Sequence, residues 1–134
     1  MKLFLLCVLS LAWAGQVLPP YTIGTSCEKD PSVNVTNLVV TPWPIYANQN
    51  YTFALSVTFT KAELLDQLTL GVKKGVTWHY TFFTINQEYA KGATATFQYS
   101  IAGPTSSGSY TDQITLHRPN YSTFACWQFD YVVN

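Results

Sequence analysis

The sequence has 134 residues, and its 7 lysines and arginines balance 7 aspartates and glutamates, so its formal net charge at pH 7 is zero. Charged residues make up only 10% of the chain, against about a quarter in average proteins, while aromatic residues reach 16%. This balance supplies no electrostatic attraction to nucleic acids or to an anionic membrane surface, and it leaves much rigid apolar surface to be buried.

The first 14 residues have the pattern of a removable signal peptide. Lys2 precedes an apolar run, Leu3–Leu11, and the small residue Ala14 marks the expected cleavage site. The run is shorter than the roughly 20 residues that span a bilayer. We therefore expect a protein that is secreted or lies in the endolysosomal lumen, with residues 15–26 as an extended N-terminal arm.

One pair of cysteines remains after this leader, which contains the third, Cys7. Cys27 and Cys126 enclose most of the remaining chain, and in an exported domain we expect them to form a disulfide. The alternative is two unrelated buried thiols. Three N-x-S/T sequons are candidate glycosylation sites in the same compartment: Asn34, Asn50 and Asn120.

Apolar and polar residues alternate with a period of two along most of the domain, which predicts β-strands. Seven ranges carry this pattern: 33–40, 51–60, 67–73, 77–85, 93–101, 109–116 and 124–133. Proline and glycine residues mark the turns between them, as in Thr41–Pro44 and Gly103–Gly108. One segment, Lys61–Gln67, has a helix-like pattern and is predicted to form a single helical turn.

Seven short, evenly spaced strands predict an all-β fold, an immunoglobulin-like antiparallel β-sandwich over residues 27–134. Parallel α/β folds are excluded, because no helical pattern separates the strands. In antibody-type domains a disulfide joins two central strands. Here the two cysteines stand at the ends of the domain instead, so the chain is not an antibody-type module.

The sequence offers no recognisable catalytic or metal-binding motif. His79 and His117 are isolated within predicted strands and have no nucleophile motif nearby. Glu63 and Asp66 are explained by a short polar turn, and no His, Cys or carboxylate cluster has the spacing of metal ligands. We therefore expect neither an enzyme nor a cofactor or metal site.

The large number of rings on the inner faces of the strands favours a hollow interior. Filled sandwiches hold their sheets about 10 Å apart, whereas small-molecule sites are cavities lined by apolar and aromatic side chains. A filled core is the alternative, since alternating apolar residues usually form one. We predict that these residues line a hydrophobic cavity and bind its ligand: Phe53, Leu55, Val57, Phe59, Trp78, Tyr80, Phe82, Phe97, Tyr99, Ile101, Ile114, Trp127, Phe129 and Tyr131.

Several segments occur in an order and spacing that is similar to a known family. They are Cys27 with Asp30-Pro31, the proline pair and Asn48–Phe53, the turn Pro104–Thr111 and the ending Cys126–Tyr131. The chain resembles the ML lipid-recognition domain family, of the Niemann–Pick cholesterol-transfer and phosphatidylglycerol/phosphatidylinositol transfer type. The resemblance implies two sheets that splay apart around the apolar part of a lipid, and a first-to-last disulfide that matches Cys27–Cys126. A further cysteine pair, which many members carry where residues 83–93 lie, is absent here.

These features predict a lipid-binding or lipid-transfer protein that holds a sterol, phospholipid or other hydrophobic ligand between its sheets. It would contact a membrane or an acceptor protein transiently, and it would need no cofactor and no nucleic acid. Lys73, Lys74 and Tyr80 are candidates for orienting a ligand head group. The rival hypothesis is a structural or interaction glycoprotein module with a filled core.

Overall fold

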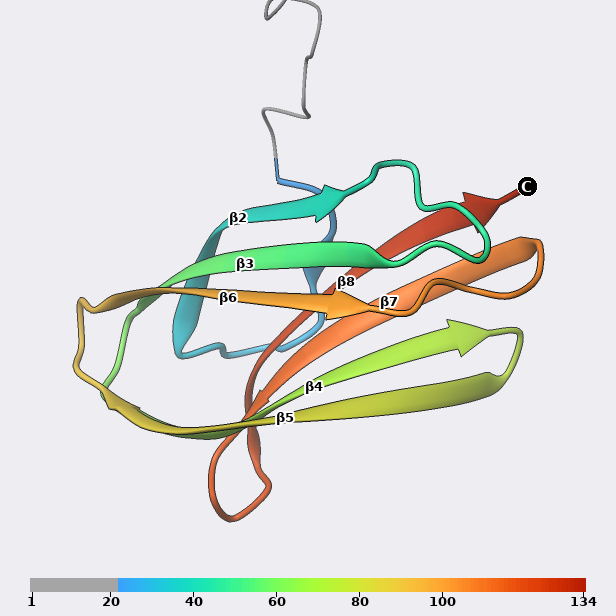
Figure 1. The fold of residues 1–134 in the computed structure, drawn as a ribbon. Coiled ribbons are helices and arrows are strands. Elements are labelled where there is room, and N and C mark those ends of the chain that lie inside the picture. The colour runs from blue at the N-terminus through green and yellow to red at the C-terminus, as the bar shows by residue number, and fades with distance from the viewer. Residues whose placement is uncertain (1–21) are drawn as a thin grey trace, which may run out of the picture.

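The computed structural model describes residues 22–134, which form two antiparallel sheets packed as a β-sandwich (Figure 1). The predicted signal peptide, Cys7 and residues 15–21 of the predicted arm lie outside the described residues. The strands are β1 (Thr25–Ser26), β2 (Val33–Thr41), β3 (Tyr51–Phe59), β4 (Glu63–Lys74), β5 (Thr77–Tyr89), β6 (Thr94–Ile101), β7 (Gly108–His117) and β8 (Thr123–Val133).

The order of the strands confirms the predicted immunoglobulin-like sandwich. One sheet has five strands in the order β1-β8-β7-β4-β5, and the other has three in the order β2-β3-β6. Leaving out the two-residue β1, these orders correspond to the G-F-C-C′ and A-B-E sheets of immunoglobulin-like folds. The additional strand lies in the predicted arm, where Thr25 and Ser26 pair with Gln128 and Trp127 of β8.

All seven predicted strands are present, but the helical turn predicted at Lys61–Gln67 is wrong. Strand β4 already begins at Glu63, and Leu65 is fully buried and paired with Gln87 of β5. The register of the β4–β5 pair shifts between Leu65 and Gln67. Between these pairs β4 contributes one residue, Asp66, and β5 contributes two, Ile85 and Asn86, so the additional residue of this bulge lies in β5.

The inward orientation predicted for Trp78, Tyr80 and Phe82 is also wrong. Tyr80 is 53% exposed and Phe82 is 64% exposed, on the outer face of the edge strand β5. Phe83 takes the inward position instead, where its ring stacks on Tyr99 of β6 with centroids 3.9 Å apart. Because phenylalanines occupy both position 82 and position 83, the sequence allows either face of β5 to point inward. Contact of Phe83 with the opposite sheet selects one of the two orientations.

The middle of the sandwich and one of its ends are filled. Along β3 the side chains alternate between the core and the outside, and the exposed fractions of Phe53 and Phe59 are 0% and 1%. At the end where β3 finishes, Phe59 stacks on Tyr89 with ring centroids 4.4 Å apart and contacts Phe124. The bidentate ion pair of Arg118 with Glu63 lies at the same end.

The predicted disulfide between Cys27 and Cys126 is present. It lies near the start of β8, and the amide of Cys27 donates a hydrogen bond to the carbonyl oxygen of Cys126 (2.9 Å). A second bond, from the amide of Ser32 to the carbonyl of Phe124 (2.9 Å), holds the following segment against the same strand. The bridge is consistent with an oxidising compartment.

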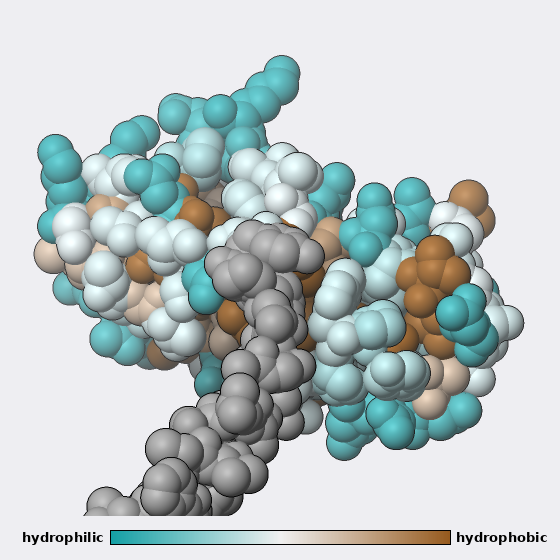
Figure 2. Space-filling view, turned by 90° about the horizontal axis from the view of Figure 1, so that it is seen from above, coloured by the Kyte–Doolittle hydropathy of each residue, from teal (hydrophilic) through white to brown (hydrophobic). Residues whose placement is uncertain are grey.

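Figure 2 shows hydrophilic and near-neutral residues over most of the visible face, with hydrophobic residues in small separate groups. Within the described residues, no helix is long and apolar enough to cross a membrane.

Candidate functional site: a cavity at one end of the sandwich

A cavity of about 580 Å³ lies between the two sheets at the end of the molecule toward which β4, β6 and β8 run (Figure 1). Its lining comes from both sheets and from the loop that joins β6 to β7. Ligand pockets for small molecules have volumes of roughly 300–1,000 Å³. The lining residues are Tyr51, Val72, Lys74, His79, Thr81, Phe83, Ser100, Ile101, Ala102, Gly103, Pro104, Thr105, Ser106, Tyr110 and Tyr131.

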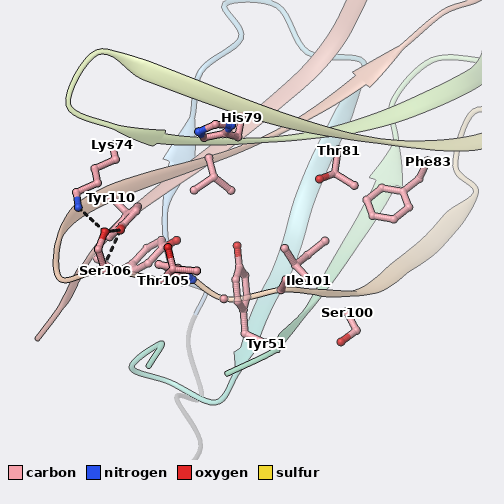
Figure 3. Close-up of a pocket in the computed structure, with 15 residues that line it drawn as sticks. Tyr51, Lys74, His79, Thr81, Phe83, Ser100, Ile101, Thr105, Ser106 and Tyr110 are labelled. Carbon is pink, nitrogen blue, oxygen red and sulfur yellow. Dashed lines mark hydrogen bonds between the residues drawn. The ribbon is translucent and has the colours of Figure 1, made fainter. Parts of the chain in front are cut away.

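Strand β5 forms one wall of the cavity, because its inward phase places His79, Thr81 and Phe83 on the same side. Figure 3 shows Thr81 and Phe83 projecting from β5 to the side where Ile101 lies, with the His79 ring beside the ribbon. Since β5 is the edge of its sheet, this wall has a solvent-exposed border. His79 and Thr81 are both exposed, whereas Ile101 is buried.

The loop between β6 and β7 closes one side of the cavity and is fixed at several points. The ammonium group of Lys74 donates hydrogen bonds to Ser106 Oγ (2.6 Å) and to the carbonyl oxygen of Ser107 (2.9 Å). The amide of Asn48 donates to the carbonyl of Pro104 (2.8 Å), which ties the loop to the β2–β3 connection. A side chain at Gly103 would overlap the backbone of this connection, so the close approach requires glycine.

A carboxylate lies buried behind the cavity wall. Asp112 of β7 has no exposed surface, and it accepts hydrogen bonds from the hydroxyls of Tyr51 (2.5 Å) and Tyr131 (2.8 Å). Burial raises the pKa of Asp112 to about 6, although the two hydrogen bonds oppose this effect. Burial and the neighbouring carboxylate also raise the pKa values of both tyrosines well above their ordinary value.

Only two of the fourteen residues predicted to bind a ligand line this cavity, namely Ile101 and Tyr131. Tyr99 and Trp127 are partly buried against the core, and the indole of Trp127 donates to the carbonyl of Ile23 (2.8 Å) near β1. Trp78, Tyr80 and Phe82 lie on the outer face, as described above. The remaining seven fill the core: Phe53, Leu55, Val57, Phe59, Phe97, Ile114 and Phe129.

Of the head-group candidates, only Lys74 reaches the cavity. Lys73 points to the outer face, where its ammonium lies 5.7 Å from the ring of Trp78. The sequence interpretation missed the polar half of the site, including His79, Thr81 and Asp112. The sequence did contain one signal for this polar half. Asp112 alternates in step with Tyr110 and Ile114, which places a carboxylate at an inward position of β7.

The three sequon asparagines are exposed, as glycosylation would require. Asn34 lies on β2, Asn50 directly precedes β3, and Asn120 lies in the β7–β8 turn. Asn120 Oδ1 accepts hydrogen bonds from the amide (3.0 Å) and hydroxyl (2.7 Å) of Ser122. Among residues 22–134, no group of three His, Cys, Asp or Glu side chains is placed to hold a metal ion.

Asp112 is expected to make the folded protein less stable at neutral pH than near pH 4. Its pKa is about 6 in the folded protein, against an ordinary value of 3.8. The folded protein therefore binds an additional proton between these values, so the free energy of unfolding falls as the pH rises through the window. The full contribution is on the order of 3 kcal/mol, at about 1.4 kcal/mol for each unit of pKa.

Urea unfolding of the wild type and of Asp112→Asn, between about pH 4 and pH 8, measures this contribution. Glu63 acts in the opposite sense, because the hydrogen bond from Arg118 lowers its pKa and its contribution is lost as the pH falls. Both proteins contain Glu63, so subtracting their free energies of unfolding at each pH removes its contribution and leaves that of Asp112. Parallel pH profiles for the two proteins would contradict the prediction.

Comparisons with known proteins place the fold but not the function. No protein-family model matches the chain, and no curated protein matches it in sequence. A Niemann-Pick type C2 protein from the Japanese carpenter ant is similar in structure, with a TM-score of 0.64 and 6% identity over 84% of this chain and 99% of that one. The C-terminal domain of Wzt matches with a TM-score of 0.62 and 16% identity, over 87% of this chain and 80% of that one.

A third similar structure is the alkylpurine DNA glycosylase AlkC of Pseudomonas fluorescens, bound to DNA with an abasic site analogue. Its TM-score is 0.55 at 13% identity, over 78% of this chain, and the matched part is 31% of that protein. At such identities the likeness concerns the fold alone. Because one fold serves proteins this different, function must be argued from the site.

Proposed function

We propose that this chain is a carrier that binds one hydrophobic small molecule, a lipid or a sterol, in the cavity between its sheets. The observation that carries the proposal is the cavity itself. Its lining joins apolar side chains such as Val72, Phe83 and Ile101 to a few polar groups at fixed positions. This combination is typical of small-molecule sites.

Binding would proceed by burial without covalent chemistry. Removing about 200 Å² of a ligand's apolar surface from water supplies on the order of 5 kcal/mol. Lys74 and His79 provide polar contacts at the cavity wall, where a head group would be oriented. The Lys74 ammonium donates hydrogen bonds to Ser106 Oγ and to the carbonyl oxygen of Ser107, contacts that fix the β6–β7 loop, and we propose a binding protein that is not an enzyme.

The compartment and the resemblance support the same proposal. A disulfide and three exposed sequons suit a secreted or endolysosomal protein, where lipids must be shielded from water. The fold likeness to a Niemann-Pick type C2 protein agrees with the ML-type segments of the sequence. Membership of the ML family and transient contact with a membrane or acceptor protein are parts of this proposal.

Mass spectrometry tests the proposal on the protein as cells export it. Native spectra should show a mass increment beyond any glycan, and organic extraction should release the corresponding lipid. Protein that is empty after purification and stays empty after incubation with vesicles of phosphatidylcholine and cholesterol would contradict a carrier function.

Filling the cavity should abolish binding while leaving the fold intact. Thr81→Trp places an indole at an inward position of β5, and we expect at least a tenfold loss of lipid occupancy, because the ligand and the new ring compete for the same volume. Thr84→Trp is the matched control, since Thr84 is exposed and has the outward phase of the same strand. Occupancy measured by native mass spectrometry should distinguish them, and equal losses would place the ligand elsewhere.

A specific observation favours the rival function, an interaction module. Trp78, Tyr80 and Phe82 form a row on the outer face of β5, with successive ring centroids 5.8 Å and 6.4 Å apart, and Tyr80 and Phe82 are exposed. Exposed aromatic rows mark interaction surfaces. If this row were the functional site, Phe82→Ala would remove partner binding, and Thr81→Trp would not.

A further inference from the structure

Three residues from three strands form one buried polar cluster at the cavity. Asp112 comes from β7, Tyr51 from β3 and Tyr131 from β8, and their exposed fractions are 0%, 2% and 6%. Both tyrosines also belong to the cavity lining. In the view of Figure 3, the ring of Tyr51 stands between Thr105 and Ile101, with its hydroxyl directed toward the opposite sheet.

The cluster has a fixed donor and acceptor arrangement. An ionised carboxylate only accepts hydrogen bonds, and a phenol has a single hydrogen to donate. Because Tyr51 and Tyr131 both donate to Asp112, neither has a hydrogen left for a ligand. Toward the cavity their oxygen atoms offer lone pairs alone, and the negative charge behind them disfavours an anion.

We propose that Tyr51 and Tyr131, held by Asp112, bind the hydroxyl group of an apolar alcohol. This inference rests on the proposed carrier function and names its ligand class. The hydroxyl hydrogen of the alcohol would be donated to a phenol oxygen at the inner end of the cavity, with the apolar part against Phe83 and Ile101. Carboxylate ligands and ligands without a donor would bind more weakly.

Protonation of Asp112 changes this preference. A protonated carboxyl donates to one phenol oxygen, and that phenol's own hydrogen becomes available to the cavity. The site can then also donate to a ligand acceptor. Other titratable or charged groups also face the cluster or its cavity from the strands packed around it. They are Lys74 on β4, His79 on β5, Tyr99 on β6 and Tyr110 on β7.

Three chain-matched probes test the inference: 1-decanol, decyl methyl ether and decanoate. The ether is an acceptor without a donor, and decanoate carries the disfavoured charge. At about pH 7.5 we expect decanol to bind at least tenfold more tightly than the ether, because the ether leaves the phenol oxygens unpaired. Near pH 4.5, where Asp112 is protonated, the ratio should fall to about threefold or less. Titration calorimetry or competition with a fluorescent apolar dye measures both ratios.

Variants test whether the preference for decanol comes from the Asp112 cluster or from other residues of the cavity. Asp112→Asn imitates the protonated state, since an amide donates to one phenol and accepts from the other, and it should remove the preference for decanol at both pH values. Tyr110→Phe is the matched control, because Tyr110 lines the same cavity and stacks on Tyr131 but donates to the carbonyl of Ser106 instead. His79→Gln is a second control, because it changes another polar side chain of the cavity lining and leaves the Asp112 cluster intact.

The possible outcomes are distinct. If decanol and the ether bind equally at about pH 7.5, the hydroxyl site is wrong while the carrier function stands. If no probe and no natural lipid binds, the carrier function fails and the inference fails with it. The wild-type ratios at the two pH values decide the question even if Asp112→Asn does not fold.

Discussion

Replacing Cys27 and Cys126 together by alanine is expected to lower the free energy of unfolding by about 4 to 5 kcal/mol. The two cysteines are 99 residues apart, and a disulfide that closes a loop of this length stabilises mainly by restricting the unfolded chain, by about 4.7 kcal/mol in the chain-entropy description. This is a large part of the 5–15 kcal/mol that keeps small domains folded. The variant should therefore be marginally stable at about 37 °C.

Urea unfolding with and without a reductant checks this expectation. The wild type should lose stability in dithiothreitol, and the double variant should be insensitive to it. The bridge lies near the start of β8, while Tyr131 at the cavity lies near its end. Ligand affinity of the folded fraction should therefore change little. A loss below about 1 kcal/mol would show that the hydrogen bonds of Cys27 and Ser32 to β8 hold this segment without the bridge.

The sequence predicts the strands well because most of them have one apolar and one polar face. In β3 the alternation is complete, and the inner residues Tyr51, Phe53, Leu55, Val57 and Phe59 are each at most 2% exposed. A period of two then assigns both the element and its inner face. The disulfide follows from the compartment and from the number of cysteines.

The candidate site could be predicted only in part, because it depends on where the packing of the two sheets leaves a cavity. Local alternation does not report the distance between sheets, so Phe53 and Ile101 carry the same pattern although one is in the core and the other lines the cavity. Strand β5 adds a second ambiguity, since its large residues occupy both phases. Polar residues of the site, such as Thr81, cannot be distinguished in the sequence from other polar strand residues, because only the structure shows the opposite wall of the cavity.

Phe53→Ala and Phe82→Ala are expected to differ by several kcal/mol in their effect on stability, although both residues are phenylalanines within strands. Phe53 is completely buried and its ring lies 5.9 Å from that of Tyr99. Truncating such a side chain removes its transfer free energy and leaves a cavity, at a cost of about 3–5 kcal/mol. Phe82 is 64% exposed, so its loss should change stability by about 0.5 kcal/mol or less.

A third variant, Phe83→Ala, tests which face of β5 points toward the core. Phe83→Ala should cost more than Phe82→Ala and less than Phe53→Ala, because Phe83 is half-buried against Tyr99. Urea unfolding of the three variants under one condition gives the order directly. If Phe82→Ala were the more costly of the two β5 substitutions, the strand would have the opposite phase. Thr81 would then face outward, and the cavity would lose the wall on which the proposed binding site depends.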